Sequence, residues 1–245
     1  MKQHLPTTLI TGGRLEQTNS AITAYFDEIR YSISTGQLNG GLHHTMAVRN
    51  QKLTFHINSE KDLPGGSVSE YLSEEFQQVD IPIHFATGLL TSAAMEKAVY
   101  ICKQANNTIV EVIATGGFDQ TSHRAGNGYF YEEKNGEYIS CKEKPIAGTI
   151  NLLIFTNKAL TDGALTRAII SITEAKTAAL IDANITSCHD STLATGTATD
   201  GIIMTIDPNG DILTDSGTYS LFGDTLAKAV KEAVYQLATN DNSSH

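Results

Sequence analysis

Apolar residues repeat along this chain with two different periods. Before residue 156 they mostly alternate with polar residues or form short β-branched runs, which is typical of strands. Other segments carry an apolar residue every three or four positions, which predicts amphipathic helices. The predicted strands are Thr8–Thr11, Ile29–Ser34, Thr45–Arg49, Lys52–Asn58, Ala98–Lys103, Thr108–Ala114, Thr149–Phe155 and Gly201–Asp207, and the predicted helices are Ser20–Glu28, Val68–Val79, 162–183 and 223–238.

Two hairpins are predicted among the strands. Thr45–Arg49 and Lys52–Asn58 are separated by a short Asn-containing turn, and Leu53, Phe55 and Ile57 alternate with polar residues in the second arm. Asn135-Gly136 lies between two arms of high β-propensity, which is a strong signal for a tight hairpin turn.

The longest predicted helix follows the apolar strand Thr149–Phe155. Thr161 lies where an N-cap is expected, and Asp162 in the first turn complements the helix dipole. These patterns predict an α+β fold in which a single domain, residues 1–239, contains a mixed β-sheet covered by helices, with one long helix after a buried central strand. Residues 240–245 have no apolar anchor and are expected to form a flexible tail.

Composition narrows the classes of partner and compartment. A chain of 245 residues with net charge −10 and scattered Lys and Arg offers no basic surface for nucleic acid or an anionic membrane. No stretch reaches the roughly 18 apolar residues of a membrane span. Three cysteines without CxxC spacing fit a reducing compartment, so a cytoplasmic protein is expected. A homo-oligomer remains possible.

Polar residues at the ends of predicted strands are candidates for a site. The segment LNGG contains Asn39, Gly40 and Gly41, and it forms either a tight turn or a loop that contacts a ligand. The strand that ends near Thr115 opens into Gly116, Gly117 and Asp119. Asn151 lies inside an apolar run, where its amide either joins two loops or contacts substrate.

The loop ATGTATD, from Ala194 to Asp200, has the densest polar chemistry. Its backbone N–H groups, three Thr hydroxyls and one carboxylate could hold an oxyanion, or they could satisfy one another in a rigid turn. On the long helix, Glu174 and Lys176 lie about 200° apart and do not pair locally. No His, Asp or Glu spacing demands a metal, and no cofactor is expected.

Several of these segments together resemble the adenosylcobinamide amidohydrolase family of corrinoid salvage. The resemblance rests on LNGG (38–41), TGLLTSA (87–93), GTINLLIFTNKALTDGALTRA (148–168), TEAKTAAL (173–180), ATGTATD (194–200) and LFG (221–223), in the family's order. The chain departs from the family at Ala198, where Gly is usual, and at TGGFDQTSHRAG (115–126).

The resemblance implies hydrolysis of the amide that joins aminopropanol to the corrin ring of adenosylcobinamide, which yields adenosylcobyric acid. The alternatives are a corrinoid- or tetrapyrrole-binding protein without catalysis, or a hydrolase of another small amide. Amide hydrolysis requires a nucleophile, oxyanion donors and a proton for the amine. The predicted catalytic residues are Glu174, Lys176, Thr197, Thr199 and Asp200, and the predicted substrate-binding residues are Asn39, Gly40, Gly41, Thr115, Gly116, Gly117, Asp119, Asn151 and Gly196.

Several catalytic assignments remain open at this stage. Asp200 or Glu174 would act as general base toward water, or Thr197 or Thr199 would attack the amide directly. The oxyanion would be held by the backbone N–H groups of Gly196 and Thr197, with or without Lys176.

Overall fold

A computed structural model describes residues 5–55, 60–118, 121–127, 131–134, 137–140 and 149–242. The helices are α1 (Val68–Gln77), α2 (Asp162–Asp182) and α3 (Leu221–Asn242), and short 3-10 turns lie at Glu60–Asp62, Pro64–Gly66, Ile83–Phe85 and Met95–Lys97. The strands are β1 (Arg14–Gln17), β2 (Ala21–Ser34), β3 (Gly41–Lys52), β4 (Ala86–Thr91), β5 (Val99–Ala105), β6 (Thr108–Thr115), β7 (Ser122–His123), β8 (Tyr131–Lys134), β9 (Glu137–Ser140), β10 (Asn151–Thr156), β11 (Ala159–Leu160), β12 (Gly196–Thr197), β13 (Gly201–Ile206) and β14 (Ile212–Leu213).

One large mixed sheet organises the molecule. Its strand order is β4-β3-β2-β13-β10-β6-β5, with β1 beside β2. The pairs β10 with β13 and β3 with β4 are parallel, and the other neighbours in this sheet are antiparallel. The predicted α+β fold with a mixed sheet and covering helices is confirmed.

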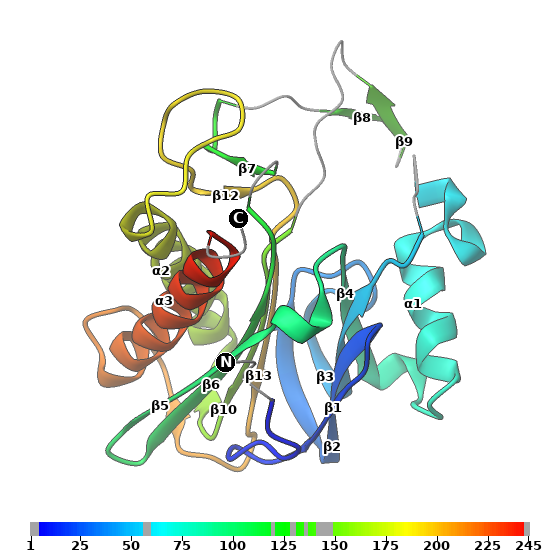
Figure 1. Ribbon diagram of the computed structural model, residues 1–245. Helices are drawn as coiled ribbons and strands as arrows, with labels where there is room; N and C mark the ends of the chain where they lie inside the picture. Colours follow the sequence, from blue (N-terminus) through cyan, green and yellow to red (C-terminus); the bar gives the residue numbers. More distant parts are fainter. Residues whose placement is uncertain are drawn as a thin grey trace.

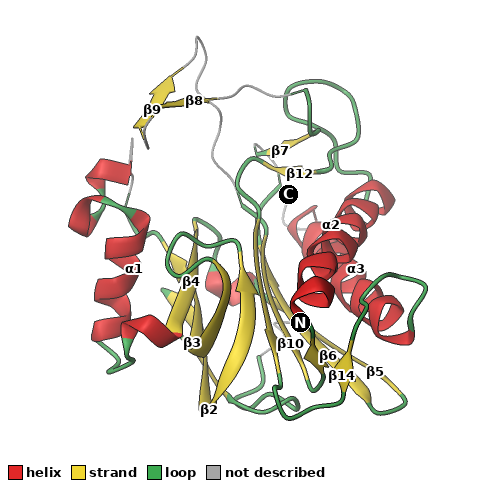
Figure 2. Cartoon of the chain, turned by 180° about the vertical axis from the view of Figure 1, so that it is seen from behind, coloured by secondary structure: helices red, strands yellow, loops and turns green. Residues whose placement is uncertain are grey.

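The large sheet is bent at β2. The pairing of β2 with β3 shifts between Tyr25 and Arg30, an irregularity that increases twist and bends a strand. As a result, Ile22 and Val48 share a buried cluster with Leu153 on β10. In both views β2, β3 and β4 lie on the α1 side of the molecule, whereas β5, β6 and β10 lie beside α2 and α3 (Figure 1, Figure 2).

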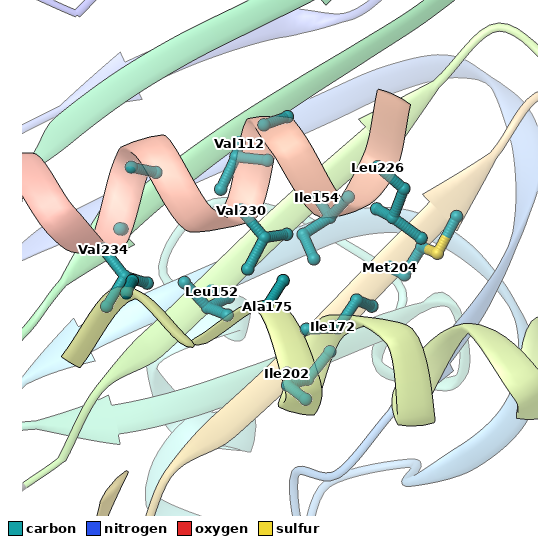
Figure 3. Close-up of a cluster of buried hydrophobic side chains, with 14 of the residues drawn as sticks. Val112, Leu152, Ile154, Ile172, Ala175, Ile202, Met204, Leu226, Val230 and Val234 are labelled. Atoms are coloured by element: carbon teal, nitrogen blue, oxygen red, sulfur yellow. The ribbon is translucent and has the colours of Figure 1, made fainter. Parts of the chain in front are cut away.

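The helices cover the two outer faces. Side chains of α2 and α3, including Ile172 and Val230, pack with Leu152 and Ile154 of β10 in the largest cluster (Figure 3). On the opposite face, Leu72 and Phe76 of α1 pack in a cluster with β3 and β4 residues. Each helix therefore buries the apolar stripe that its sequence predicts.

Most predicted elements exist with shifted ends. The helix predicted at Val68–Val79 is α1, and the strand predicted at Thr149–Phe155 is β10. Thr161 caps α2, because its hydroxyl accepts a hydrogen bond from the N–H of Ala164 at 3.3 Å. The predicted hairpin near residue 135 corresponds to β8 and β9, while Asn135 and Gly136 themselves lie outside the described residues.

Three predictions near the amino end are wrong. Ser20–Glu28 is not a helix, because Ile22, Ala24 and Phe26 bury one face with the period of two that makes this segment part of β2. Thr8–Thr11 forms no strand, and Thr8 makes a single bridge to Arg14.

The predicted hairpin of Thr45–Arg49 with Lys52–Asn58 is also wrong. Residues 41–52 form the single strand β3, in which Asn50 and Gln51 are buried. Residues 56–59 lie outside the described part of the chain.

Helix α3 is longer than the helix predicted at 223–238, because it begins at Leu221 and continues to Asn242. Residues 243–245 lie outside the described range.

Candidate active site

The parallel strands β10 and β13 begin at the same edge of the large sheet. Their first residues, Asn151 and Gly201, are register partners, and Thr115 at the end of β6 is the partner of Asn151 on its other side. The loop that ends at Asp200 and the segment after Thr115 therefore meet at this edge. Half of the predicted site residues are in these two segments.

Lys176 and Asp200 form an ion pair at this edge. Lys176 Nζ, from α2, donates a hydrogen bond to Asp200 Oδ2. The exposed fractions of the two side chains are 9% and 13%, so both charges are largely withdrawn from water. A buried ion pair is stable when further hydrogen bonds satisfy its remaining lone pairs.

Asp200 receives those further hydrogen bonds from the backbone and from Thr197. The N–H of Ile150 donates to Oδ1 at 3.0 Å, and the N–H of Thr197 lies 3.2 Å from each carboxylate oxygen. Thr197 Oγ1 donates to Asp200 Oδ1 at 2.5 Å. Lys176, Asp200 and Thr197 thus form one connected group, hereafter the Lys176–Asp200–Thr197 cluster.

Gly196 is required by the geometry of this cluster. A Cβ atom at this position would collide with Asp200 Oδ2 and would lie 2.7 Å from Lys176 Nζ. Any larger residue must therefore displace the ion pair. The small residue expected of a ligand-binding loop has a local structural reason here.

Thr199 lies at the exposed side of the same loop. Its carbonyl accepts a hydrogen bond from Thr149 Oγ1 at 3.1 Å, and the two hydroxyl groups also share a hydrogen bond. These contacts join the loop to the chain just before β10. The hydroxyl groups of Thr197 and Thr199 thus have different partners.

Glu174 does not join the cluster. It is exposed on α2, two residues before Lys176, and this spacing turns the two side chains about 200° apart on a helix. Lys176 faces the site and is buried, so Glu174 must face solvent. The structure therefore does not bring Glu174 together with Lys176 and Asp200.

The backbone N–H of Thr197 also differs from the expected oxyanion donor. It points at the carboxylate of Asp200, which already occupies the position that an oxyanion would take. The ammonium group of Lys176 carries three N–H donors, and one of them bonds to Asp200.

The segment after Thr115 pairs directly with the Asp200 loop. In the short sheet of β7 and β12, His123 is the partner of Gly196 and Ser122 is the partner of Thr197. The hydroxyl of Ser122 donates to the carbonyl of Phe118 at 2.8 Å and is fully buried. This segment thus lies directly beside the residues of the cluster in β12, while Asp119 lies outside the described residues.

Two of the predicted binding glycines line the beginning of this segment. A Cβ atom on Gly116 would lie 3.1 Å from the carbonyl oxygen of Thr149, so the segment passes close to the start of β10. Gly117 has open space at the equivalent position.

Asn151 joins the two halves of the bent sheet. Its Nδ2 donates to Asn50 Oδ1 at 2.7 Å and to the carbonyl of Leu90 at 2.8 Å. Asn50 Nδ2 in turn donates to Thr115 Oγ1 at 2.7 Å. These contacts match the expectation that the Asn151 amide joins separate segments. The sequence pattern predicts a turn at residues 50–51, so it does not indicate that Asn50 is buried and bonded to Asn151.

Asn39 and Gly40 lie in the turn between β2 and β3, and Gly41 is the first residue of β3. Asn39 has φ of 47° and Gly41 has φ of 81°. Asn39 Nδ2 donates to the carbonyls of Ile83 and Ala86, each at 2.7 Å. The turn interpretation of LNGG accounts for these residues, and none of these contacts reaches the Lys176–Asp200–Thr197 cluster.

Two further properties concern only the residue ranges that the structure describes. Within those ranges, no three or more His, Cys, Asp or Glu side chains are grouped so that they could hold a metal ion. No helix in the described part of the chain is long and apolar enough to cross a membrane.

A sequence model described as adenosylcobinamide amidohydrolase matches residues 6–245. The chain belongs to the adenosylcobinamide amidohydrolase family. The motifs that the resemblance relied on, including TEAKTAAL and ATGTATD, contain the three residues of the Lys176–Asp200–Thr197 cluster.

Two proteins and one solved structure are reported as similar to this chain. A Halobacterium salinarum protein with the name adenosylcobinamide amidohydrolase is 30% identical over 207 residues, covering 82% of this chain and 77% of its own. An uncharacterized protein of Methanocaldococcus jannaschii is 29% identical over 243 residues, covering 95% of this chain and 90% of its own. A crystal structure of a Pyrococcus horikoshii protein aligns with a TM-score of 0.43 at 11% identity, covering 98% of this chain and 81% of that one.

Proposed function

We propose that this protein hydrolyses the amide bond between aminopropanol and the corrin ring of adenosylcobinamide, releasing adenosylcobyric acid. Membership of the family supports the substrate. The observation that carries the reaction type is the Lys176–Asp200–Thr197 cluster, which combines a carboxylate, an ammonium group and a hydroxyl group at the meeting point of two loops.

The cluster supplies the elements that amide hydrolysis requires. Asp200 accepts the proton of the attacking hydroxyl group and later returns a proton to the departing amine. Lys176 donates a hydrogen bond to the carbonyl oxygen as negative charge develops on it. Because both side chains are largely removed from water, these electrostatic interactions are stronger than they would be at an exposed site.

The overall reaction is balanced without a redox partner. Water adds across the amide carbon–nitrogen bond, so the corrin side chain leaves as a carboxylic acid and aminopropanol leaves as an amine. Of the protein groups, Asp200 transfers protons and Lys176 stabilises the developing negative charge. No metal or cofactor is part of this proposal.

The test is incubation of the purified protein with adenosylcobinamide, followed by separate measurement of free aminopropanol and of the corrinoid product. We expect both to appear in equal amounts and with many turnovers per protein. Binding of the corrinoid, detected by a change in its absorbance spectrum, without release of aminopropanol would instead identify a binding protein. Release from simpler amides at comparable kcat/KM would contradict the proposed corrinoid substrate.

A further inference from the structure

The carboxylate of Asp200 has little capacity left for a water molecule. Oδ1 accepts hydrogen bonds from Ile150 N, Thr197 N and Thr197 Oγ1, and Oδ2 accepts from Lys176 Nζ and Thr197 N. A carboxylate offers about four lone-pair positions for such bonds. A water molecule that gave its proton to Asp200 would first have to displace one of these donors.

The hydroxyl group of Thr197 already occupies such a position. Thr197 Oγ1 donates a hydrogen bond to Asp200 Oδ1, which is the contact expected between a nucleophile and its base. Lys176 holds the same carboxylate from the other oxygen, as the third group that orients the base. Thr197, Asp200 and Lys176 are thus hydrogen-bonded in the order nucleophile, base and orienting group.

Backbone contacts hold Thr197 in place next to two exposed residues of the loop. Its backbone N–H is bound to Asp200, and β12 pairs it with Ser122 on β7. Thr197 is 6% exposed, whereas the next two residues, Ala198 and Thr199, are exposed. The exposed surface next to Thr197 in the chain is therefore formed by residues 198 and 199.

We propose that Thr197 is the nucleophile and that hydrolysis proceeds through an ester between Thr197 and the corrinoid acyl group. This inference rests on the proposed function. Thr197 Oγ1 forms a bond to the amide carbonyl carbon, and its proton passes to Asp200. The carbon–nitrogen bond then breaks, and the proton on Asp200 moves to the leaving amine nitrogen. Water then takes the position on Asp200 that the Thr197 hydroxyl group has left, and it attacks the ester carbon. Its proton passes through Asp200 to Thr197 Oγ1, and the acid departs.

Variants of Thr197 separate this mechanism from direct attack by water. Thr197→Val keeps the shape of the side chain but lacks the hydroxyl, and Thr197→Ser keeps a hydroxyl. We expect Thr197→Val to lower kcat by about a thousandfold or more and Thr197→Ser to retain measurable turnover. Thr177→Val is the matched control, because the Thr177 hydroxyl bonds to the carbonyl of Thr195 in the same loop at 3.1 Å.

The decisive readout uses hydroxylamine as a competing acceptor. An acyl-Thr197 ester should partition between water and hydroxylamine, so a corrinoid hydroxamate should replace part of the acid, in parent, Thr197→Ser and Thr177→Val but not in Thr197→Val. Aminopropanol release by Thr197→Val within tenfold of the parent, with a melting temperature near that of the parent, would overturn the proposal. The proposal would also be overturned if the parent, in the presence of hydroxylamine, released aminopropanol and formed the acid but no hydroxamate.

These outcomes distinguish the nucleophile from the activity itself. If the parent releases aminopropanol but the hydroxylamine test fails, the proposed function stands and the covalent step is wrong. If the parent releases no aminopropanol, the proposed function fails and the nucleophile assignment fails with it.

Discussion

Gly196 leaves the space in which the carboxylate of Asp200 lies. A Cβ atom on Gly196 would overlap Asp200 Oδ2 and would also crowd Lys176 Nζ. We therefore predict that Gly196→Ala displaces the ion pair and lowers kcat/KM by about tenfold to a hundredfold, because small displacements of catalytic groups are costly. Steady-state kinetics of aminopropanol release measures the effect.

Gly163→Ala is the control for that substitution. Gly163 lies in the first turn of α2, and a Cβ atom there meets nothing within 4 Å. Alanine at a compatible helical position should stabilise the protein by up to about 1 kcal/mol and leave the rate unchanged. An equal loss of rate in the two glycine variants would contradict the role assigned to Gly196.

Removal of one partner of the Lys176–Asp200 pair should destabilise the fold as well as the site. Lys176→Met leaves Asp200 charged, largely buried and without its cation, at a cost of about 3 kcal/mol. The double variant Lys176→Met with Asp200→Asn should lose less than the sum of the two single variants, by about 1–3 kcal/mol. Urea unfolding measures all four free energies, and strict additivity would show that the pair does not interact.

The hydrophobic pattern predicted the covered sheet but not the path of its longest strand. The central strand, the long helix and its Thr161 cap were predictable because periodicity and capping are local properties. The Ser20–Glu28 segment was misassigned because its buried face depends on packing against β10, which is more than a hundred residues away in sequence. The same nonlocal packing keeps Asn50 buried inside β3.

The site could be predicted from sequence as a set of segments but not as a set of contacts. Lys176, Thr197 and Asp200 belong to motifs visible in the sequence, yet the Lys176–Asp200 hydrogen bond joins α2, which ends at Asp182, to a loop that begins only at Ala194. Glu174 shares the same motif and faces away. The sequence motif contains both Glu174 and Lys176, and only the geometry of the helix determines which of the two faces the site.

A second buried carboxylate offers a test of stability that is separate from the site. Glu111 on β6 is fully buried and accepts hydrogen bonds from Ile10 N, Thr11 N, Thr11 Oγ1 and the Tyr100 hydroxyl. Glu111→Ala leaves those donors unsatisfied, so we expect a loss of about 3 kcal/mol in the free energy of unfolding. At a temperature where the variant is folded, kcat should stay within about twofold of the parent. A large loss of kcat in folded protein would contradict this separation.

His43 should make stability depend on pH below neutrality. Its ring nitrogens are buried, and burial is the main cause that lowers the pKa of His43, with a smaller contribution from His44. Because the unfolded chain then binds more protons, stability falls as pH drops through and below the ordinary histidine pKa of about 6.5. The decrease in unfolding free energy from about pH 7.5 to pH 5 should be smaller in His43→Gln than in the parent. Equal pH dependence in the two proteins would contradict the assignment.

The most direct test of the central claim compares aminopropanol release from adenosylcobinamide by the parent and by Asp200→Asn. We predict multiple turnovers for the parent and a kcat at least about a hundredfold lower for Asp200→Asn, as expected for loss of a general base. Asp182→Asn, at an exposed position on α2, should retain the parental rate. Near-parental release by folded Asp200→Asn, or no release by the parent, would contradict the account.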